Sequence, residues 1–238
     1  MTKLSVNINK IATIRNARGG DTPNVLQAAI DIENFGAEGI TVHPRPDERH
    51  ITRKDAYGLG ETVKTEYNIE GYPSEDFIHM VLEIKPTQVT LVPDGPDVVT
   101  SNAGWDCIHQ KDYLSPIIKR FKNEGIRVSV FIDPVVEQID AALSCGTDRV
   151  ELYTEAYASK YAVNRAEAIA PYKAAAKRAT ELGIGINAGH DLSLENLEYF
   201  TTEIPDTLEV SIGHALISDA LYYGLNNAVG MYKNKLSK

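Results

Sequence analysis

Eight short runs of β-branched and apolar residues recur along the chain, separated by longer stretches in which apolar residues follow helical spacing. This alternation is typical of repeated βα units, which build a parallel sheet. Eight parallel strands close a (β/α)8 barrel, and 238 residues suit that fold. We therefore predict an α/β protein with a single (β/α)8 TIM barrel domain over residues 1–238. The expected strands are Leu4–Asn9, Gly39–His43, Glu66–Glu70, Gln88–Pro93, Arg127–Asp133, Arg149–Thr154, Gly185–Ala188 and Leu208–Ile212.

Helices are expected between these strands, because the apolar residues there lie three or four positions apart. Asn24 or Thr22 is placed to cap the first helix and Ser74 to cap a later one. A glycine follows four of the helices and directly precedes a strand, which is typical of a left-handed helix cap. These glycines are Gly36, Gly125, Gly146 and Gly183. The expected helices cover residues 25–35, 52–63, 74–84, 115–124, 135–144, 164–182, 193–202 and 215–235.

Two connections exceed the short loops of the fold, namely Pro93–Tyr113 and Glu155–Val163. Long loops at the carboxyl ends of barrel strands are candidates for lids over an active site. A plain surface insertion explains the second connection equally well.

Composition restricts the partners. The net charge of −9 gives an acidic surface that repels nucleic acid and anionic membranes, so an anionic ligand needs a few placed Arg, His or backbone N–H groups. No apolar run approaches the roughly 20 residues of a membrane span, and no signal peptide is expected. Cys107 and Cys145 lie in no metal or redox spacing, which indicates reduced thiols in a cytoplasmic protein.

Polar and ionisable residues end most of the expected strands, where TIM barrel enzymes carry their active sites. The segment Gly39–His50 places His43, Arg45 and His50 together, which combines a proton-transfer group with anion-binding groups. Glu70 ends the third strand, where a buried carboxylate is costly unless it is functional or forms a salt bridge with a barrel arginine.

The other strand ends favour ligand binding. Gly189-His190 and Gly213-His214 close the seventh and eighth strands, whose loops commonly hold phosphate in this fold. Alternation along the first strand turns Asn7 and Asn9 to one face, where they can hydrogen-bond a polyol. Arg15 and Arg18 are further candidates for phosphate binding, although exposed arginines are usually only solvated.

With these residues identified, the chain resembles the pyridoxine 5′-phosphate synthase family over essentially its whole length. The most specific segments include Arg15–Gly19, Gly39–His43, Asn68–Glu70, Asn187–His190 and Ile212–Ala215. The resemblance implies a barrel enzyme that condenses 1-deoxy-D-xylulose 5-phosphate with 3-amino-2-oxopropyl phosphate, releasing phosphate and water. It also implies a homo-octamer without a metal or organic cofactor, in which the loop after the fourth strand closes over the site.

Matched by position, the resemblance implies that His43, Glu70 and His190 transfer protons. The substrate and phosphate contacts it implies are Asn7, Arg18, Arg45, His50, Thr100, Gly213 and His214.

Many members of the family carry Asp-His where this chain has Asn9-Lys10, and Gly where it has Asp191. Asn9 and Lys10 retain hydrogen-bonding groups, so we expect substrate binding there to survive. A carboxylate at Asp191 is unfavourable beside an anionic ligand unless its side chain points away and only its N–H is used.

Two other functions remain open from the residues alone. A Schiff-base aldolase acting on a sugar phosphate needs a lysine in the barrel mouth, and Lys10 is the candidate. A non-catalytic barrel that binds a phosphorylated metabolite needs only the phosphate groups. A metal-dependent hydrolase is disfavoured, because Arg45 stands where a second ligand beside His43 belongs.

Overall fold

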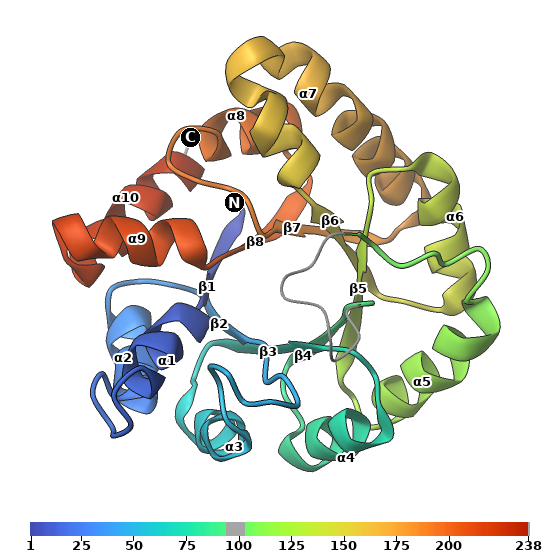
Figure 1. Cartoon of the computed structure of the whole chain (residues 1–238). Coiled ribbons are helices and arrows are strands. Elements are labelled where there is room, and N and C mark those ends of the chain that lie inside the picture. The colour runs from blue at the N-terminus through green and yellow to red at the C-terminus, as the bar shows by residue number, and fades with distance from the viewer. Residues whose placement is uncertain (94–102, 238) are drawn as a thin grey trace.

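Eight parallel strands close into a barrel in the order of the sequence, and β1 pairs with both β2 and β8. Figure 1 shows this computed structural model along the barrel, with the helices outside the ring of strands. The structure describes residues 1–93 and 103–237. The strands are β1 (Lys3–Asn7), β2 (Gly39–Val42), β3 (Glu66–Gly71), β4 (Gln88–Leu91), β5 (Arg127–Ile132), β6 (Arg149–Tyr153), β7 (Gly185–Gly189) and β8 (Thr207–Ile212). The predicted TIM barrel is confirmed.

The helices between the strands bury their apolar sides against the barrel. In the described part of the chain they are α1 (Asn9–Asn16), α2 (Val25–Asn34), α3 (Arg53–Thr62), α4 (Glu75–Ile84), α5 (Lys111–Asn123), α6 (Val136–Cys145), α7 (Glu155–Leu182), α8 (Leu197–Glu203), α9 (His214–Tyr223) and α10 (Leu225–Leu236). Caps define several boundaries. Asn24 Oδ1 accepts the Gln27 N–H at 2.8 Å at the start of α2, and Gly146 and Gly183 end α6 and α7 in the left-handed conformation.

Four helix predictions were wrong in detail, and one of them concerns α8, which begins at Leu197 and not at residue 193. Residues 155–163 form the beginning of α7, not a loop, and Asn164 breaks the helical geometry where the predicted helix was to start. The ring of Tyr157 is fully buried and packs 5.3 Å from that of Phe200, so tertiary packing stabilises this stretch as a helix. The expected final helix is divided at Gly224, whose φ of +79° is outside helical geometry. Helix α5 begins at Lys111, four residues before the predicted Ser115.

The first strand is shorter than predicted. It ends at Asn7, and Asn9 is the first residue of α1, a helix that the sequence analysis did not expect. The alternation argument for Asn7 and Asn9 is therefore wrong as a strand argument. The two residues are nevertheless in contact, because Asn7 Oδ1 accepts the backbone N–H of Asn9 at 3.1 Å.

Charged side chains fill the amino-terminal end of the barrel. Glu66 contacts both Lys3 and Arg127, and Arg149 Nη1 lies 3.8 Å from Glu209 Oε2. Burial raises the pKa of Glu209 to about 7, with the charge of Glu66 adding to the effect. This layer closes the bottom of the barrel, so ligand access is left to the opposite end.

We expect Glu209 to make the protein less stable as the pH rises. Its folded-state pKa of about 7 lies above the ordinary value of a glutamate in the unfolded chain, so the stabilisation is present at low pH and is lost as the pH rises through 7. Between pH 5 and pH 8, the free energy of unfolding of the unchanged protein should fall by roughly 2–3 kcal/mol more than that of Glu209→Gln, as measured by urea denaturation. Equal pH dependence in the variant and the unchanged protein would contradict this.

Candidate active site

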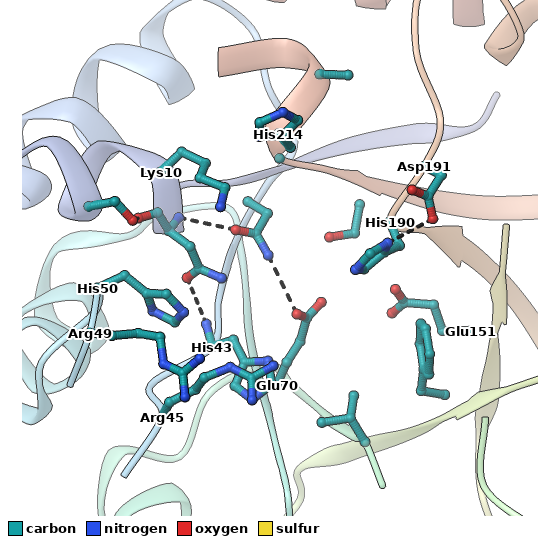
Figure 2. A pocket seen from close by; sticks show the side chains of 18 residues that line it. Lys10, His43, Arg45, Arg49, His50, Glu70, Glu151, His190, Asp191 and His214 are labelled. Carbon is teal, nitrogen blue, oxygen red and sulfur yellow. Dashed lines mark hydrogen bonds and ion pairs between the residues drawn. The ribbon is translucent and has the colours of Figure 1, made fainter. Parts of the chain in front are cut away.

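A cavity of about 830 Å³ opens at the carboxyl ends of the strands. Figure 2 shows its side chains converging from several strands and from the loops that follow them. The lining residues are Asn7, Asn9, Lys10, Thr13, His43, Arg45, Arg49, His50, Glu70, Val92, Phe131, Glu151, His190, Asp191, Ser211, Gly213, His214 and Ala215. Most of these residues have polar or charged side chains, so the cavity suits a polar, anionic ligand.

Cations and imidazoles gather on one wall, formed by the connection after β2 and the start of α1. Figure 2 places Lys10, Arg45, Arg49 and His50 together there, with His43 beside Glu70 at the base. Arg45 is only 8% exposed, although it is a guanidinium. The wall concentrates positive charge on a protein whose net charge is −9, and so provides the local anion-binding groups that the composition requires.

Both histidines of this wall are held neutral. Burial lowers the pKa of His43 well below its usual value, and the charges of Arg45 and Arg49 add to that effect. Burial likewise lowers the pKa of His50 to about 4, assisted by Arg45 and Lys10. At neutral pH, His43 can therefore accept a proton. The Ile51 N–H donates to His50 Nδ1 at 3.0 Å, so neutral His50 carries its proton on Nε2 and donates from there.

The first residue of α1 holds the backbone of His43 in place. Asn9 Oδ1 accepts the backbone N–H of His43 at 2.9 Å, which ties the start of α1 to the end of β2. Asn7 Nδ2 donates to Glu70 Oε2 at 3.5 Å and links β1 to β3. The side chains of Asn7 and Asn9 thus link Glu70 and His43 to the same short segment at the base of the cavity.

A second carboxyl, Glu151 of β6, lies across the base from His43 (Figure 2). It is 3% exposed, and burial, with the nearby charges of Glu70 and Glu209, raises its pKa well above the usual value. This shift favours the neutral, protonated form of the Glu151 carboxyl. The sequence analysis did not assign this residue to the site. The signal was a charged residue inside an otherwise apolar strand, Val150-Glu151-Leu152.

The opposite wall carries His190 and Asp191 at the end of β7. His190 Nδ1 lies 2.7 Å from Asp191 Oδ2. His190 has a φ of +86°, which is uncommon for a residue other than glycine and is found most often at functional sites. Gly213 closes the neighbouring β8 end, where a Cβ atom would lie only 3.0 Å from the Cβ of Asn7. Any larger residue there would crowd Asn7, so glycine suits the close approach of β8 to β1.

Most of the residues predicted from the sequence line this one cavity. Those brought together are Asn7, Asn9, Lys10, His43, Arg45, His50, Glu70, His190, Asp191, Gly213 and His214. Arg18 is exposed and is not part of the lining, and Thr100 lies outside the described residues. Arg49, which is not among the residues predicted from the sequence, is also part of the lining.

Arg15 proves to be structural. Its guanidinium makes two hydrogen bonds to Asp55, at 2.5 and 2.7 Å, and donates to the His50 carbonyl at 3.2 Å. Asp55 also forms a capping box with Thr52 at the start of α3. The pair therefore anchors the connection after β2 and is not available for phosphate.

Comparison with known proteins identifies the family. The family model described as pyridoxal phosphate biosynthesis protein PdxJ matches residues 4–238. The chain belongs to the PdxJ family. Curated relatives named pyridoxine 5′-phosphate synthase include one from Flavobacterium johnsoniae, 61% identical over 236 residues (99% of this chain and 100% of the relative). Another, from Cytophaga hutchinsonii, is 60% identical over 238 residues and covers 100% of both chains.

Solved structures share the fold of this PdxJ chain at low sequence identity. Phosphoribosyl anthranilate isomerase from Thermococcus kodakaraensis has a TM-score of 0.64 at 12% identity, covering 100% of both chains. Tryptophan synthase from M. tuberculosis has a TM-score of 0.66 at 13% identity, covering 98% of this chain and 92% of that one. These likenesses concern the barrel alone.

Among residues 1–93 and 103–237, no group of three or more His, Cys, Asp or Glu side chains is arranged to hold a metal ion. Within the same described ranges, no helix is long and apolar enough to cross a membrane.

Arg15→Ala should lower the free energy of unfolding by about 3–5 kcal/mol, because it leaves the Asp55 carboxylate buried without its partner. Arg18→Ala, three residues away and exposed, should change stability by less than about 0.5 kcal/mol. Urea denaturation of both variants measures the difference. An Arg15 variant as stable as the Arg18 variant would contradict the structural role.

Proposed function

We propose that this chain is a pyridoxine 5′-phosphate synthase that condenses 1-deoxy-D-xylulose 5-phosphate with 3-amino-2-oxopropyl phosphate by general acid–base catalysis. It is a transferase-class, ring-closing enzyme that forms the pyridine ring and releases phosphate and water. The observation that carries the proposal is the convergence of three ionisable groups, His43, Glu70 and His190, on one cavity with a cationic wall.

The cationic wall supports the binding of two phosphorylated substrates. Arg45, Arg49 and Lys10 provide positive charge, and neutral His50 donates a hydrogen bond from Nε2. At the end of β8, which pairs with β1, α9 begins at His214 directly after Gly213, so the N–H groups of its first turn supply a second anion-binding position. Each substrate carries one phosphate, and two separate anion sites meet that requirement.

Proton transfer is divided among groups with different protonation states. Joining an amine to a ketone, losing water twice and expelling phosphate requires several transfers, which a single base cannot supply. Neutral His43 can accept a proton, and Glu70, tied to Asn7, lies beside it. We assign to His190 the protonation of a departing or carbonyl oxygen on the opposite side. Burial raises the pKa of Glu151, so its protonated form adds a hydrogen-bond donor to the base of the cavity.

Glu70→Gln should lower kcat by about 10²–10⁴-fold with little change in KM, because the amide keeps the shape of the side chain but cannot exchange the proton. Phosphate release and the absorbance of the product measure turnover. Glu61→Gln, which removes an exposed carboxylate from α3, is the matched control and should be fully active. Near-normal turnover of the Glu70 variant would remove Glu70 as a base, and a borohydride-trapped Lys10 adduct would favour the Schiff-base alternative.

We also propose that the chain assembles as a homo-octamer and works in the cytoplasm. The last turn of α9 supports assembly, because Leu221, Tyr222 and Tyr223 are 72%, 85% and 53% exposed and lie next to each other. Light scattering should give a mass eight times the 26.2 kDa of the chain. A monomer mass at working concentration would contradict the proposed assembly.

A further inference from the structure

The wall opposite the cations contains a carboxylate–imidazole pair built from adjacent residues. His190 Nδ1 and Asp191 Oδ2 are 2.7 Å apart, and the two side chains are 33% and 32% exposed. Figure 2 shows the contact at the rim of the cavity, with the imidazole between Asp191 and Glu151. A carboxylate oxygen can only accept, so the proton of this bond belongs to Nδ1 of His190.

The backbone beneath the pair is anchored on both sides of Asp191. Its N–H donates to Thr154 Oγ1 at 3.1 Å, and the Thr154 hydroxyl donates to the Gly189 carbonyl at 2.6 Å. Its carbonyl accepts from Asn196 Nδ2 at 3.2 Å. Thr154 is fully buried, so this frame is inside the protein. The backbone that carries Asp191 is therefore held in place by side chains of the protein interior.

The imidazole of His190 also has an aromatic neighbour. The ring of Tyr153 lies edge-on to that of His190, with centroids 5.4 Å apart and an interplanar angle of 84°. His190 adopts its unusual positive φ at the same position. Since Nδ1 is engaged by Asp191, proton exchange between His190 and a substrate runs through Nε2.

We propose that Asp191 is a positioning residue for His190, holding Nε2 toward the substrate and stabilising the protonated imidazole that donates to a leaving or carbonyl oxygen. The inference rests on the proposed role of His190 as the proton donor. It also accounts for a carboxylate beside an anionic ligand, because the charge of Asp191 is balanced by protonated His190.

Other ionisable groups face His190 from the elements packed around it. Burial raises the pKa of Glu151, which favours its uncharged form beside the imidazole. His43 is neutral for the opposite reason, since burial lowers its pKa. Asp191 therefore supplies the carboxylate in direct contact with the ring. The facing groups are Glu151 and Tyr153 from β6, Glu70 from β3, His43 from β2 and His214 from α9.

Asp191→Asn tests the inference, because it keeps the shape and a hydrogen-bond acceptor but removes the charge. NMR titration of the His190 ring should show loss of its proton at a pH lower by about 0.5–1 unit. The alkaline limb of kcat against pH should move equally, so kcat at pH 8 falls about 3–10-fold while KM changes less than about 2-fold. Asp191→Glu, which retains the charge, should restore both midpoints.

Glu195→Gln is the matched control, because it removes one exposed carboxylate from the same connection between β7 and α8. It should leave the His190 titration and the kcat profile unchanged. An unshifted His190 titration in Asp191→Asn overturns the inference, and so does a rise in KM alone, which would make Asp191 a ligand contact. Full activity of His190→Gln would instead refute the proposed role of His190, and the NMR titration separates these two failures.

Discussion

The site depends on the closure of eight parallel strands into a ring. Parallel strands bring all their carboxyl ends to the same end of the barrel, so residues far apart in the chain meet there. His43, Glu70, Glu151 and His190 come from β2, β3, β6 and β7 or the residue that follows them. The charged layer of Glu66, Arg127, Arg149 and Glu209 fills the other end, which leaves one open mouth for substrates.

Electrostatics divides that mouth into two sides with different tasks. On one side, burial and the guanidinium groups keep His43 and His50 neutral, so one accepts a proton and the other donates a hydrogen bond. On the other side, Asp191 places a carboxylate against His190 and favours its protonated form. His43 and His190 thus acquire opposite proton-transfer properties from their neighbours in one cavity, which is the arrangement that acid–base catalysis requires.

Support for these groups comes from residues that do not line the cavity. Arg15 and Asp55 anchor the connection that carries His43, Arg45 and His50, and Thr154 anchors the one that carries His190. Tyr157 and Tyr172 reinforce the second side, because Tyr157 donates to the Asn196 carbonyl at 2.7 Å and Tyr172 to the Tyr153 carbonyl at 2.8 Å. Such supporting contacts determine how precisely the reacting groups are placed.

The amino-acid sequence by itself determined the eight strands, their order and most helix boundaries, because apolar spacing and caps such as Asn24 and Gly146 act locally. It also indicated which polar residues end the strands, and the barrel brings those residues together. Only the tertiary structure decided that residues 155–163 are helical, that Arg15 pairs with Asp55, and that Glu151 and Arg49 line the cavity. The same holds for the neutral state of His43. These properties depend on which side chains from distant strands meet and how far water is excluded from them, and no local pattern encodes either.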